Sequence, residues 1–152
     1  MAGAPAFVDG IGVLLKIVRD GLSGINVYEE IPDHLFDHLP ALVINRTGGA
    51  SNTPTWTSGF FCHFQVWSRA TDEYPNDPYQ ATYELSQKVA RLLYQAWRDQ
   101  TVARDGDGKA LGWIASWRES SGFQRLTDAD LPNDVGRYVA VYDLLIRNPR
   151  SA

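Results

Sequence analysis

The chain is poor in cysteine, in lysine and in long apolar runs. Cys62 is the only cysteine among 152 residues, so no internal disulfide can form and a reducing compartment is expected. Cys62 stands in an apolar stretch without a flanking catalytic motif, which favours a small buried side chain over a reactive thiol. No stretch reaches the roughly 20 apolar residues of a membrane-spanning helix, and residues 1–5 lack the basic start of a secretory signal. These absences predict a soluble protein with no membrane partner.

Basic residues are scattered along the chain. Lys and Arg number 14 against 18 Asp and Glu, which gives a formal net charge of −4. Proteins that grip duplex nucleic acid need a dense basic surface that displaces phosphate counterions. The sequence therefore disfavours a protein that binds DNA or RNA tightly. With 44% hydrophobic residues, the chain is long enough for one core, and we expect a single domain over residues 1–152 with a disordered tail at 148–152.

Apolar residues at helical spacing predict two helices. The first covers residues 6–22, and its apolar stripe is Val8, Ile11, Leu15, Val18 and Leu22. The second is longer and covers residues 79–100, and its stripe is Leu85, Val89, Leu92, Leu93 and Ala96. Each helix has a polar face, so each is expected to pack on one side only.

Strands are predicted at 25–29, 41–45, 59–68, 110–118 with 122–126, and 137–147. In 59–68 the side chains of Phe60, Cys62, Phe64 and Val66 point one way and those of Phe61, His63, Gln65 and Trp67 the other. The last strand is apolar on both faces except at Asp143, which is typical of a central strand. Gly122 suggests a bulge or bend. The element order predicts an α+β fold: a mainly antiparallel sheet with two helices packed on one face.

The motifs of common catalytic and metal sites are incomplete. His34 and His38 have metal-ligand spacing, but the glutamate of the zinc-protease pattern is missing. Residues 105–108 begin like a calcium loop, yet Lys109 and Ser116 occupy two ligand positions, so a tight turn is the simpler explanation. Gly48 and Gly49 follow a strand without the rest of a phosphate loop, and the hydrolase elbow is absent. We expect no catalytic, metal-binding or cofactor-binding residues, and no enzyme.

Aromatic residues and one acid are the remaining candidates for function. Five tryptophans exceed what a core of this size needs, and aromatics outside a core favour a protein interface. Trp113 and Trp117 are four apart in a strand and are expected on one face, either in an interface or at the edge of the core. Trp56 lies in a polar loop. Asp143 either faces solvent or pairs with an arginine such as Arg46 or Arg118.

The order and spacing of several short motifs resemble the tail terminator (tail completion) proteins of long-tailed bacteriophages. The resemblance covers nearly the whole chain. Its motifs follow the N-terminal helix in this order: the Val27-Tyr28 strand, Leu39-Pro40-Ala41-Leu42-Val43-Ile44, Arg46-Thr47-Gly48-Gly49, Val66-Trp67-Ser68, the helix from Ala81 to Val89, Ser121-Gly122, Leu126-x-Asp128, Arg137-Tyr138 and Ile146-Arg147.

The resemblance implies a structural protein of the virion, assembled in the host cytoplasm. Such subunits form a homo-hexameric ring at the head-proximal end of the tail tube, end tube polymerisation and meet the head-completion or connector proteins. Genomic DNA passes through the lumen without sequence-specific binding. The residues expected at subunit or partner contacts are Arg46, Trp56, Trp113, Trp117, Arg137, Tyr138, Tyr142 and Asp143. The alternatives are another head–tail connector, such as a head-closure or adaptor subunit, and a small ligand-binding module or enzyme.

Overall fold

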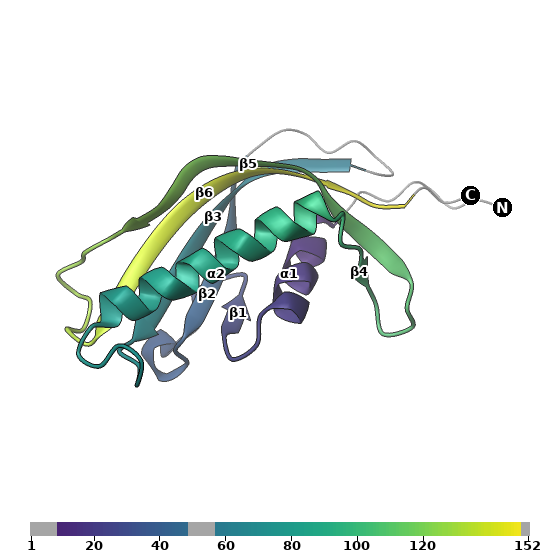
Figure 1. Ribbon diagram of the computed structural model, residues 1–152. Helices are drawn as coiled ribbons and strands as arrows, with labels where there is room; N and C mark the ends of the chain where they lie inside the picture. Colours follow the sequence, from purple (N-terminus) through teal and green to yellow (C-terminus); the bar gives the residue numbers. More distant parts are fainter. Residues whose placement is uncertain (1–8, 49–56, 150–152) are drawn as a thin grey trace.

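The computed structural model describes residues 9–48 and 57–149, which form one six-stranded sheet and two helices (Figure 1). The strand order is β1-β2-β3-β6-β5-β4, and every neighbouring pair is antiparallel except β1 with β2. The elements are α1 (Gly10–Gly21), β1 (Asn26–Tyr28), the 3-10 turn η1 (Leu35–Asp37), β2 (Ala41–Gly48), β3 (Thr57–Arg69), α2 (Pro78–Arg98), β4 (Ala103–Arg104), β5 (Ala110–Arg125) and β6 (Val135–Arg147). The α+β prediction is confirmed.

Both helices begin at an aspartate that caps the first turn. The Asp9 carboxylate accepts a hydrogen bond from the Gly12 amide at 2.9 Å, and Asp77 accepts one from the Gln80 amide at 3.0 Å. Pro78 follows the second cap, where its missing amide hydrogen costs nothing. The second helix lies within two residues of its predicted ends. The first begins at Gly10, and the predicted residues 6–8 lie outside the described part of the chain.

The sheet curls around α2, which runs along its concave face, while α1 lies beside the C-terminal half of α2 (Figure 1). The main core forms where the apolar stripes of both helices meet the inner face of the strands. Phe60, Cys62, Phe64 and Val66 of β3 are at most 1% exposed there, so the predicted alternation of β3 is confirmed. Burial of this continuous apolar layer is the main force that holds the helices on the sheet.

A second, smaller core lies on the outer, convex face at one end of the sheet. Trp67 of β3 is buried there together with Val43 and Val135. The linker between β1 and β2 (residues 29–40) and the loop between β5 and β6 (residues 126–134) cover it. The outer face is thus covered at one end by the chain's own loops.

The sequence predicts β5 as two strands, but it is one strand with an irregular register. Its pairing with β6 shifts between Ile114 and Ser116, between Glu119 and Ser121, and between Ser121 and Gln124. The last shift includes the bend expected at Gly122. The two-residue β4 is absent from the prediction, because a strand this short carries no alternation to detect.

Candidate interaction surface

Two of the predicted contact residues belong to the main core: Tyr142 is buried in it, and Trp117 is half-buried against it. Tyr142 of β6 is 0% exposed, and its ring stacks on Trp117 with centroids 5.8 Å apart. Trp117 stacks in turn on Trp97 of α2 at 6.0 Å. Burial raises the pKa of the Tyr142 hydroxyl. The Tyr142 side chain is thus enclosed within the subunit and is not available for the predicted contact, whereas half-buried Trp117 keeps an exposed part and its predicted contact stays a prediction.

Trp113 and Trp117 lie on opposite faces of the sheet, which corrects the prediction that they share one. Opposite residues of antiparallel strands point to the same face. Trp113 stands opposite Arg147 and Trp117 opposite Leu144, and these partners are three residues apart on β6. The cause is the register shift between Ile114 and Ser116, which changes the alternation by one residue. Trp113 is half-buried on the outer face.

Asp143 pairs with Arg118, one of the two partners proposed for it. Their side chains lie 3.3 Å apart on the outer face, opposite each other in the β5–β6 register. The arginine side chain is 74% exposed and the aspartate 37%, so water screens the pair. Arg46, the other proposed partner, lies on the inner face with its guanidinium 5.5 Å from the centre of the Phe60 ring.

Arg137 and Tyr138 occupy the two faces of β6 near its start. The Arg137 guanidinium lies 5.2 Å from the centre of the Trp67 ring and donates a hydrogen bond to Gln65. Burial lowers the pKa of Arg137, although nearby Asp128 opposes this. Tyr138 packs on the inner side against Tyr83 of α2 at 6.0 Å, and its pKa is raised chiefly by burial. Trp56, the remaining predicted contact, lies outside the described residues.

The outer face of the sheet is uncovered beyond the Trp67 cluster, within the part of the chain that the structure describes. Phe61 of β3 is 38% exposed, and Val141 and Leu145 of β6 are half-buried beside it. His63 lies between these apolar groups, and its pKa is lowered by burial and then by the charge of Arg137. Together with Trp113 and the Arg118–Asp143 pair, these residues form the outer patch. The predicted contact residues Trp113 and Asp143 thus lie on the outer face, while Arg46 and Tyr138 lie on the inner face.

Acidic side chains gather at one end of the molecule, a cluster that the sequence does not predict. Three loops far apart in sequence meet at the lower left of Figure 1: residues 29–40, 70–77 and 126–134. At this end they place eight of the 18 acidic residues, namely Asp33, Asp37, Asp72, Glu73, Asp77, Asp128, Asp130 and Asp134. Glu29 and Glu30 follow β1 farther up the sheet, where the Glu29 carbonyl accepts a hydrogen bond from Asn45. Arg69 links two of these loops, since it forms an ion pair with Asp134 and donates a hydrogen bond to the Phe36 carbonyl at 2.9 Å. The remaining acids make this end strongly negative.

The described residues contain no group of three His, Cys, Asp or Glu that could hold a metal ion. His34 and His38 flank the short turn η1. Cys62 is buried in the core, and burial raises the pKa of its thiol to about 12. A thiol with that pKa stays protonated near neutral pH and is a poor nucleophile. No helix within residues 9–48 and 57–149 is long and apolar enough to cross a membrane.

No protein-family model matches the chain, and comparison with curated proteins finds no similar sequence.

Proposed function

We propose that this protein is a structural subunit of a bacteriophage tail that forms a hexameric ring at the head-proximal end of the tail tube. The observation that carries the proposal is the order of motifs along nearly the whole chain, from Leu39-Pro40 to Ile146-Arg147, which resembles tail terminator proteins. The open apolar outer patch supports an assembling protein, because a folded subunit gains stability when a neighbour covers such a surface.

The proposed ring acts through its shape and its contacts, and no bond is made or broken. Identical subunits close a ring through two different surfaces, so that one surface of each copy meets the other surface of the next. One side of the closed ring covers the last layer of tube subunits and ends polymerisation. The other side receives the head-completion proteins.

The charge of the chain suits a ring through which DNA passes. A formal net charge of −4 repels phosphate, so DNA slides through the lumen without being held. Basic residues on the outer patch are few, and Arg118 there is neutralised by Asp143. The outer patch is therefore mainly apolar, with its arginine and aspartate paired, and is not broadly cationic.

Negative-stain electron microscopy of the purified full chain tests this proposal. We expect ring-shaped particles with a central hole and six-fold class averages. Particles of another closed symmetry would favour a different head–tail connector, and compact particles without a hole at every concentration would contradict a ring built by this chain alone.

A further inference from the structure

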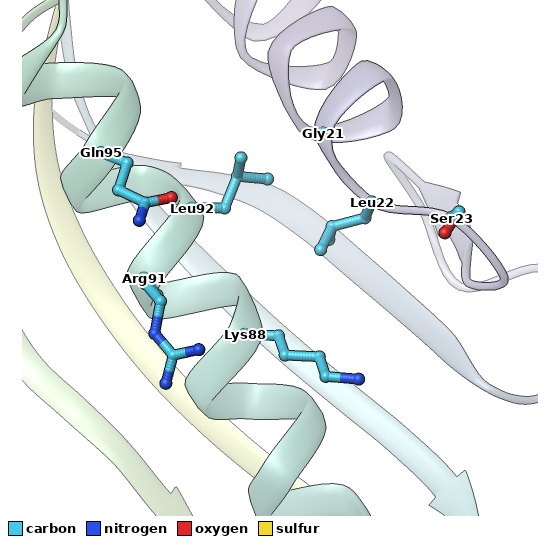
Figure 2. A pocket seen from close by; sticks show the side chains of 7 residues that line it. All are labelled: Gly21, Leu22, Ser23, Lys88, Arg91, Leu92 and Gln95. Carbon is cyan, nitrogen blue, oxygen red and sulfur yellow. The ribbon is translucent and has the colours of Figure 1, made fainter.

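A groove lies between the end of α1 and the middle of α2 (Figure 2). Its volume is about 250 Å³, and its lining residues are Gly21, Leu22, Ser23, Lys88, Arg91, Leu92 and Gln95. Gly21 brings the helices together, since a Cβ atom there would lie 2.4 Å from Cδ1 of Leu92. Leu22 and Leu92 are both partly buried against the core and supply an apolar floor.

Two cations rim this groove on the α2 side. Figure 2 shows Lys88 and Arg91 projecting from the helix beside the opening. Both side chains belong to exposed residues, and neither has an ion-pair partner among the described residues. By contrast, Lys16, Arg69, Arg98 and Arg118 each form an ion pair within the chain. The groove therefore fits an extended segment with an apolar side chain flanked by carboxylates.

The linker between β1 and β2 contains such a segment on the surface. Its sequence Glu29-Glu30-Ile31-Pro32-Asp33 places acids on both sides of Ile31. Ile31 is 55% exposed, the highest value among the large hydrophobic side chains in the described part of the chain. The linker is fixed at both ends, because Asn45 donates a hydrogen bond to the Glu29 carbonyl at 2.9 Å and Asn26 donates one to the His38 carbonyl at 2.7 Å. Ile31 thus presents an apolar side chain to solvent between carboxylates, at a fixed place on the subunit.

We propose that residues 29–33 of one copy dock in the α1–α2 groove of a second copy. Ile31 enters between Leu22 and Leu92, and the carboxylates of Glu30 and Asp33 meet Lys88 and Arg91. The linker does not line the groove of its own chain, so the two surfaces are separate. Joining two different surfaces of identical subunits gives a head-to-tail contact, the kind that closes a ring. This inference rests on the proposed ring and assigns one of its contacts to named residues.

Complementary charge also explains why the second copy is the favoured occupant. The acidic segment and the unpaired cations occur on the same chain, so every copy supplies both partners at equal concentration. Opposite charges across an interface speed association and fix its register. An acidic segment of another protein is the competing occupant.

Charge reversal with rescue tests the contact. The groove variant is Lys88→Glu with Arg91→Glu, and the linker variant is Glu30→Lys with Asp33→Lys. We expect each variant to lose the oligomer that the wild type forms, because like charges then face each other. The variant with all four changes should regain it. The matched control, Arg104→Glu at the end of β4 with Lys109→Glu in the turn before β5, reverses two basic residues away from the groove and should assemble like the wild type.

Cysteine cross-linking gives a readout that does not require a stable oligomer. Ile31→Cys protein is mixed with Gln95→Cys protein at high concentration under mild oxidation, and disulfide-linked dimers of the two are measured. The proposal predicts mixed 31–95 dimers above the level that either variant forms alone. If the wild type forms rings but neither mixed dimers nor charge rescue is observed, the contact is wrong and the ring stands. If the wild type stays monomeric and no mixed dimer forms, both the contact and unaided ring formation are wrong.

Discussion

Trp117 stacks on Tyr142 at an interplanar angle of 27°, and the pair continues into Trp97 on α2. This aromatic row joins β5, β6 and the long helix, from buried Tyr142 to the half-buried rings of Trp117 and Trp97 at the edge of the main core. The two tryptophans of β5 therefore have different roles, since Trp113 lies on the outer face.

This difference predicts unequal effects of two otherwise identical substitutions. Trp117→Ala should lower the free energy of unfolding by about 3 kcal/mol, the lower end of the range for a buried tryptophan, because the half-buried ring loses its stacking on Tyr142 and Trp97. Trp113→Ala should cost about 1 kcal/mol, because its site is open on one side. Urea unfolding of both variants measures this, and equal losses would contradict the assignment of the two residues to opposite faces.

The buried thiol predicts a loss of stability at alkaline pH. In the folded protein Cys62 has a pKa of about 12, whereas its ordinary value is 9.0. Between these values the unfolded chain releases the thiol proton and the folded chain keeps it, so rising pH favours unfolding by up to about 1.4 kcal/mol per pH unit. Tyr142, whose pKa is also raised by burial, acts in the same direction above its ordinary value of 10.0.

Denaturant unfolding at several values between pH 8 and pH 11 checks this slope. Cys62→Ala should flatten it without removing it, because Tyr142 still contributes. A variant whose slope equals that of the wild type would show that the thiol does not titrate as its burial requires.

Gly136 is predicted to tolerate no side chain. A Cβ atom there would lie 2.6 Å from the Pro78 carbonyl oxygen and 2.6 Å from the Thr82 hydroxyl oxygen, so α2 would have to shift. We expect Gly136→Ala to cost about 1–3 kcal/mol. Gly106→Ala is the control, since a Cβ atom there would meet no neighbouring group within 4 Å, and it should change the melting temperature little. Similar melting temperatures for both variants would contradict the close contact of α2 with β6.

The Arg118–Asp143 pair should contribute little to the stability of the isolated subunit. Both side chains are open to water, so Asp143→Asn is expected to lower the free energy of unfolding by less than about 1 kcal/mol, and less still in high salt. Thermal unfolding at two salt concentrations measures the effect. A large loss that salt does not reduce would mean that the pair is buried by a contact the isolated subunit lacks.

The regular parts of the fold were predictable because their patterns are local. The alternation from Phe60 to Val66 and the helical spacing from Leu85 to Ala96 each follow from one segment of sequence. The face of Trp113 was not predictable, because the register shift beside it depends on pairing with β6. Tyr142 was misplaced for a related reason: its strand is apolar on both faces, so the sequence does not say which face the helices cover.

The candidate contact surfaces could not be predicted from the sequence, because each one combines segments that only the fold brings together. The acidic end unites loops that are separated by tens of residues, and no charge run marks it in the sequence. In the sequence, Lys88 and Arg91 have the pattern of an ordinary solvated helix face. In the folded chain, Leu22 of the segment after α1 lies beside them and completes a groove. The proposed contact between residues 29–33 and the α1–α2 groove depends on the exposure of Ile31, which is a property of the folded chain.

The most direct test of the proposed ring is the mass of the purified protein, measured by light scattering behind a sizing column over a range of concentrations and salt. We predict a hexamer, or a monomer–hexamer equilibrium that shifts toward hexamer as concentration rises. A strict monomer at every concentration would contradict a ring formed by this chain alone.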